Sequence, residues 1–164
     1  DPLKLFRTFV RDMPFVAAMG PLGRFMLSDR SRGGASFDLR SREIVIDRVC
    51  ARCGCEYEWG VHVASYARKA ELTEDQIYST VHGLATDACW SPRDRALVAM
   101  VDELRDSGGL GDAAYAALTE HFDENQILEL FALAGWYQAI AFMANGMRTE
   151  LEDWAPRFPD RRTP

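Results

Sequence analysis

Residues 42–63, REIVIDRVCARCGCEYEWGVHV, decide how this chain is interpreted. We expect one helix over residues 39–52 and a second over residues 55–69, because apolar residues recur in both at helical spacing. The segment IVIDRV on its own is also typical of a short strand. No other part of the chain shows convincing strand alternation, so the stretch indicates two consecutive helices.

Three side chains that could take part in acid–base or thiol chemistry share one face of the second helix. Cys55, Glu58 and His62 stand at positions i, i+3 and i+7. Glu43 lies on the preceding helix and reaches this face if the two helices form a hairpin. A carboxylate can hydrogen-bond an imidazole four residues away, and partial burial makes such a pair a candidate acid–base unit.

A plain interpretation competes with this one. A Glu and a His at i, i+4 are usually a solvated pair on a helix surface. Here the same face carries Cys55 and is flanked by Tyr57 and Trp59, so we expect this face to be partly shielded from solvent. We therefore take Glu58 and His62 as candidate catalytic residues, with Tyr57 or Trp59, or a neighbouring subunit, closing the pocket.

The rest of the chain also predicts helices. Thr73 and Asp123 begin capping boxes, and Ser91 precedes a first-turn proline. We expect Pro14 to break a helix over residues 3–19. Residues 131–147 are the most apolar stretch, which we interpret as a buried core helix. The prediction is an all-α bundle of about six to eight helices.

Length and composition set further bounds. The 164 residues suit one domain, 1–164, with a helical extension over 1–38 and an arm over 152–164. A net charge of −6 disfavours nucleic acid and anionic membranes as partners. Three of the four cysteines crowd into residues 50–55, which favours reduced thiols and a cytoplasmic protein.

The sequence resembles the carboxymuconolactone decarboxylase family, which includes the alkyl hydroperoxidase D-like proteins. The resemblance extends over residues 39–150. It is carried by RExxI from Arg42, CEYEWxxH from Cys55, LTEDQI from Leu72, RALVAMVDEL from Arg95 and QILELFALAGWYQAIAF from Gln126. It implies an all-helical fold of the alkyl hydroperoxidase D type that assembles as a homotrimer or homohexamer, with sites near subunit contacts.

The resemblance implies two chemistries, and one substitution separates them. The hydroperoxidase branch has an upstream Glu, here Glu43, then C-x-x-C and a His, here His62. Glu58 stands where that branch has its second, peroxide-attacking Cys, and a disulfide cycle needs two thiols. The decarboxylase branch has a carboxylate in the place of Glu58, which suits protonation of a carbon as carbon dioxide leaves.

Three functional hypotheses follow. The first is a cofactor-independent, decarboxylase-like enzyme that uses Glu58 and His62 on a small carboxylated or lactone-type molecule, with Glu43 and Cys55 shaping the pocket. The second is a thiol-dependent antioxidant protein that uses Cys55 with Cys53 or Cys50. The third is a non-catalytic helical assembly module.

Other candidate site residues surround the motif. Arg40, Arg48 and Arg52 are placed to hold a substrate carboxylate, and Tyr57 and Trp59 to contact the substrate. The spacing C-x-x-C-x-C lacks the second, distant ligand pair of structural zinc sites. We therefore expect no metal, and the decarboxylase-like chemistry that the resemblance implies needs no cofactor.

Overall fold

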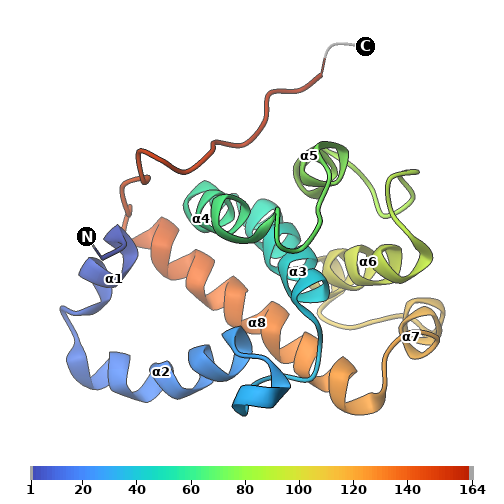
Figure 1. Ribbon diagram of the computed structural model, residues 1–164, viewed down its shortest axis with the longest axis horizontal. Helices are drawn as coiled ribbons and strands as arrows, with labels where there is room; N and C mark the ends of the chain where they lie inside the picture. Colours follow the sequence, from blue (N-terminus) through green and yellow to red (C-terminus); the bar gives the residue numbers. More distant parts are fainter. Residues whose placement is uncertain (1, 163–164) are drawn as a thin grey trace.

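The computed structural model describes residues 2–162, and these residues form eight α-helices and one short 3-10 helix (Figure 1). No β-strand occurs in this part of the chain, so the all-α prediction is confirmed. The helices are α1 (Lys4–Phe9), α2 (Met13–Leu27), η1 (Arg30–Arg32), α3 (Leu39–Arg52), α4 (Glu56–Tyr66), α5 (Glu74–His82), α6 (Pro92–Ser107), α7 (Asp112–Thr119) and α8 (Glu124–Gly146).

Helix α3 is the centre of the fold. It packs against α4, α5, α6 and α8, and residues 41–50 are all buried. The IVIDRV segment is therefore helical, because a helix surrounded by four others can bury β-branched side chains on every face. Its buried charge at Arg48 is compensated by a bidentate contact with Asp102 at 2.7 and 2.8 Å.

The expected helix starts are confirmed. Thr73 and Asp123 form complete capping boxes with the glutamines three residues later. The Ser91 side chain accepts a hydrogen bond from the Asp94 amide, and Pro92 occupies the first turn of α6.

The expected break in the N-terminal helix is present, but it lies at residues 10–12, just before Pro14. The chain turns between α1 and α2, and Pro14 lies in the first turn of α2, where its missing amide hydrogen costs no helical bond. Asp12 caps that turn by accepting from the Phe15 amide. The N-terminal segment thus forms two helices joined before the proline.

Helix α8 crosses the middle of the molecule (Figure 1). By length and composition alone it could span a membrane. Its contacts with α2, α3, α4 and α7, and buried residues from Ile127 to Ala144, are those of a core helix.

The C-terminal arm packs on the rest of the same chain. The Glu152 carboxylate accepts from the Lys4 amide and from the Tyr57 hydroxyl, so the arm joins α1 to α4. A Cβ on Gly60 would lie 2.4 Å from the Pro156 carbonyl oxygen. Only glycine at that position lets the arm approach α4 so closely.

Candidate active site

The turn between α3 and α4 sets the geometry of the site. Gly54 has φ of 61°, a left-handed conformation that glycine adopts without strain. The Cys55 amide then donates back to the Cys50 carbonyl at 2.8 Å. This turn lays α4 back along α3, so that Glu43 near the start of α3 meets His62 on α4.

Glu43 and His62 form a buried pair. The His62 Nδ1 atom lies 2.7 Å from Glu43 Oε2, and both side chains are almost fully excluded from solvent. The other Glu43 oxygen accepts from Arg42 Nε at 2.6 Å. Arg42 also donates to the Leu27 carbonyl at 2.7 Å, which ties the end of α2 to this pair.

The second ring nitrogen of His62 faces two further groups. Nε2 lies 3.0 Å from the Tyr137 hydroxyl oxygen and 3.6 Å from Glu58 Oε1. Glu58 Oε2 is buried and has no hydrogen-bond partner among the described residues. The Glu43 carboxylate thus binds Nδ1 of the imidazole. The Glu58 carboxylate lies next to Nε2 and has one oxygen without a hydrogen-bond partner among the described residues.

The electrostatics of this cluster favour a charged imidazole. Burial lowers the pKa of His62, but the hydrogen bonds and charges of Glu43 and Glu58 outweigh that effect and raise the pKa to about 10. Burial, reinforced by Glu58, raises the pKa of Tyr137, which stays a neutral phenol. At neutral pH, Nδ1–H therefore donates to Glu43 and Nε2–H donates to the Tyr137 oxygen.

A further acid lies behind the pair. Asp47 is fully buried, one helical turn after Glu43, and neither of its carboxyl oxygens has a partner among the described residues. Burial raises the pKa of Asp47 well above its ordinary value, and the Glu43 charge adds to the effect. Asp47 therefore favours its neutral form more strongly than an exposed aspartic acid does.

Beside His62 lies a cavity of about 560 Å³ between α1, α2, α4 and α8. Glu58, His62, Tyr66 and Tyr137 provide polar groups on its wall, whereas α1 and α2 contribute mainly apolar side chains. Glu58 and His62 line this cavity, whereas Glu43 binds His62 from α3 and is not part of the lining. The cover of the cavity is formed by α1 and α2, which the sequence interpretation had not assigned to it.

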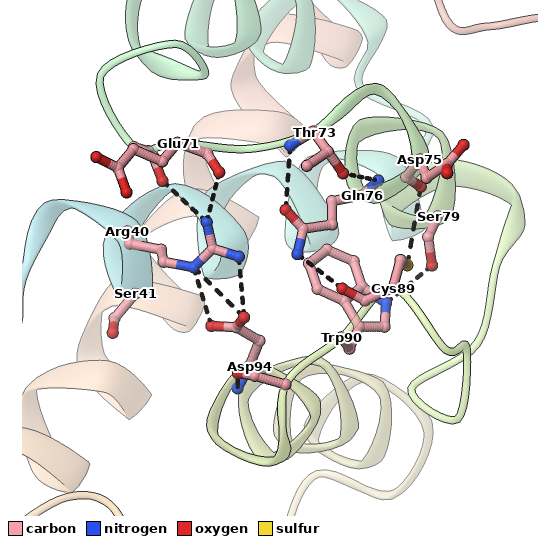
Figure 2. Close-up of polar contacts among 12 residues, drawn as sticks. Arg40, Ser41, Glu71, Thr73, Asp75, Gln76, Ser79, Cys89, Trp90 and Asp94 are labelled. Carbon is pink, nitrogen blue, oxygen red and sulfur yellow. Dashed lines mark hydrogen bonds and ion pairs between the residues drawn. The ribbon is translucent and has the colours of Figure 1, made fainter.

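Arg40, Arg48 and Arg52 do not reach this cavity. Figure 2 shows the Arg40 guanidinium between the Asp94 carboxylate and the Glu71 carbonyl. Arg40 Nη2 donates to Asp94 Oδ2 at 2.9 Å, and Nη1 donates to the Glu71 carbonyl at 2.8 Å. Its Nη1 also donates to the Ala70 carbonyl. Arg52 pairs with carboxylates of α6, as Arg48 does. In this structure these arginines join α3 to its neighbours.

Tyr57 and Trp59 are also structural in this arrangement. The Tyr57 hydroxyl accepts from the Leu5 amide at 2.9 Å and donates to Glu152. The Trp59 indole donates to Thr80 Oγ1 at 3.0 Å and packs edge-on against Phe158. Neither residue lines the cavity, because both point from α4 toward other parts of the core.

The cysteines are free and lie off the cavity wall. Cys55 is the N-cap residue of α4 and is buried. Burial raises the pKa of the Cys55 thiol to about 11 and that of Cys50 well above its ordinary value. Burial also raises the pKa of Cys53. These thiols are largely protonated at neutral pH and hence weak nucleophiles.

The sequence interpretation did not identify Tyr137, Asp47 or the cavity-lining side chains of α1 and α2. A signal existed for Asp47, since it stands four residues after Glu43 on the same helix face. No local signal pointed to Tyr137, which meets His62 across 75 residues of chain. Among residues 2–162, no group of three or more metal-binding side chains is arranged to hold an ion.

Comparison with solved structures identifies the class of fold. The chain resembles a crystal structure from Agrobacterium tumefaciens with a TM-score of 0.75 and 20% sequence identity, covering 87% of this chain and 93% of the other. That protein is described as being of unknown function and as a candidate antioxidant defence protein of the AhpD type. At this identity the likeness defines an AhpD-like fold.

The family follows from the sequence. The model of the carboxymuconolactone decarboxylase family matches residues 22–103, which span α3, α4 and α5 and most of α6. The chain belongs to the carboxymuconolactone decarboxylase family. No curated protein matches it.

Proposed function

We propose that this protein is a cofactor-independent enzyme that transfers a proton to a carbon of a small carboxylated or lactone-type molecule. One observation carries the proposal. Glu58, with one unpartnered carboxylate oxygen, lines a cavity beside an imidazole whose raised pKa keeps it charged at neutral pH. Such a pair is a proton donor next to a space for substrate.

In a decarboxylation, each residue of the site has a separate role. The bond from the carbon to the carboxylate breaks, carbon dioxide leaves, and the electron pair stays on the carbon. The charged imidazole passes its Nε2 proton to the Glu58 carboxylate, Glu58 delivers that proton to the carbon, and water then reprotonates the imidazole. Glu43 fixes the ring through Nδ1, and Tyr137 orients Nε2.

The surroundings of the cysteines favour this chemistry over a thiol peroxidase. Glu58 occupies the position of the second family cysteine, and the raised pKa of Cys55 disfavours its thiolate. The cavity beside His62 also favours an enzyme over a helical assembly module, in which packed side chains would fill that space.

The experiment is a turnover assay with a panel of carboxylated lactones and related acids, using four variants. Glu58→Gln and His62→Gln should each lower turnover by about 10²–10⁴-fold, the usual contribution of a general acid–base group. Cys55→Ser and the exposed control Glu120→Gln should retain activity. Peroxide consumption that depends on Cys55 would instead support the antioxidant hypothesis.

A further inference from the structure

One cation on the wall of the cavity has no polar partner among residues 2–162. Arg24, in the last turns of α2, lines the cavity and is exposed to solvent. Within that described part of the chain, its guanidinium makes no hydrogen bond or ion pair. The guanidinium lies along its own helix, because a Cβ built on Gly20, another lining residue, would be 3.4 Å from Arg24 Nη1.

Two contacts place this part of α2 at the His62 end of the cavity. Gly23 approaches the ring of Trp136 closely, with 3.5 Å from an ideal Cβ, and the next residue, Tyr137, binds His62. Leu27, three residues after Arg24, accepts from the same Arg42 that holds Glu43. The last turn of α2, which carries Arg24, therefore lies beside the polar end of the cavity, and the guanidinium extends from there along α2 toward Gly20.

The remainder of the cavity is apolar. Its lining toward α1 consists of hydrocarbon and aromatic side chains, among them Leu5, Phe6, Phe9, Val16, Met19 and Ile140. A charged or strongly polar group placed there would lose its hydration without gaining a partner. The volume, about 560 Å³, suits an organic molecule of moderate size.

We infer that Arg24 is a substrate-positioning residue and that the cavity takes an acid with one carboxylate and an apolar body, aliphatic or aromatic. The carboxylate binds the Arg24 guanidinium, and the apolar body extends toward α1. This inference rests on the proposed function in one respect: it places the carbon next to the carboxylate at the Glu58–His62 pair. A diacid fits less well, because its second carboxylate would enter the apolar end.

Binding of three simple probes, measured by calorimetry on the full chain, tests the inference apart from turnover. The probes are octanoate, 1-octanol and octanedioate, which share a chain length and differ in charge. We expect octanoate to bind about tenfold more tightly than octanol, the usual effect of one charge-assisted contact. Octanedioate should bind more weakly than octanoate.

Variants test whether the preference for octanoate over octanol depends on Arg24. Arg24→Gln should abolish the tenfold preference for octanoate, and Arg24→Lys should keep part of it. The matched control Arg11→Gln removes the same charge from the same N-terminal segment, outside the cavity lining, and should leave it unchanged. Thermal unfolding should show that all three variants fold, since Arg24 has no partner in the described chain to lose.

The outcomes separate the two proposals. Equal binding of octanoate and octanol by the wild-type chain, or an equal effect of Arg11→Gln, overturns the role of Arg24. Tighter binding of octanedioate overturns the substrate class. If octanoate binding depends on Arg24 while no acid shows turnover that depends on Glu58, the inference about binding stands and the proposed proton transfer fails.

Discussion

Replacing Glu43 by Gln should move the titration of His62 strongly toward lower pH. The pKa of His62 is about 10, against an ordinary value of 6.5. Since each pKa unit corresponds to about 1.4 kcal/mol, the carboxylates favour the charged ring by roughly 5 kcal/mol, even after the opposing effect of burial. Glu43, with the shorter contact of 2.7 Å, should supply the larger share of that energy.

The Glu43→Gln substitution keeps the shape of the pair and removes its charge. The side-chain amide oxygen can still accept from Arg42, which also keeps the Leu27 carbonyl and its position over the Tyr66 ring, so we expect the variant to fold. With Glu58 as the one remaining carboxylate contact, the pKa of His62 should fall by about two units, equivalent to roughly 3 kcal/mol.

The assay is a pH titration of the histidine ring resonances by NMR. The chain has two other histidines, His82 and His121, whose ring resonances serve as internal controls. An unchanged pKa of His62 in the variant would refute the claim that Glu43 holds the imidazole in its charged form.

Three further measurements test other parts of the structure. Because the folded state raises the pKa of His62, the contribution of His62 to stability should be complete below about pH 6.5 and should disappear as pH rises toward 10. Urea unfolding of wild type and His62→Gln should therefore give a smaller difference in the free energy of unfolding at pH 9.5 than at pH 6. A difference that grows with pH would contradict this. Cys50 and Cys55 should react slowly with iodoacetamide at pH 7.5, because burial raises both pKa values; mass spectrometry showing either one modified faster than Cys53 in the native protein would argue against the buried thiols described above. The exposed apolar side chains Phe142 and Trp154 should be covered in a symmetric homo-oligomer; light scattering should give a mass above that of one chain at micromolar concentration, and a monomer mass would exclude this assembly.

The sequence predicted the central hairpin and its main contact well. Helical periodicity, the capping residues and the family motif are local, and they predicted α3 with its observed bounds and α4 with its observed start to within one residue. Glu43 and His62 meet because two adjacent helices fold across a short turn, and this too is nearly local information.

The surroundings of that hairpin depend on longer-range packing. From the sequence, the arginines of α3 were candidates for binding a substrate carboxylate. In the structure, Arg40 and Arg52 instead pair with carboxylates of α6, 54 residues further along the chain. The N-terminal helices line the cavity with apolar side chains, and some of these, such as Phe6 and Val10, are also exposed to solvent. Periodicity shows that such helices bury surface, but not which cavity they cover.

In the proposed mechanism, a proton passes from His62 to Glu58 and from Glu58 to a substrate carbon. Turnover in D₂O, followed by NMR of the product, tests it most directly. We predict one deuterium at the protonated carbon and a rate about 10²–10⁴-fold lower in Glu58→Gln, with no loss in Glu120→Gln. Deuterium incorporation at an undiminished rate in Glu58→Gln would contradict this mechanism.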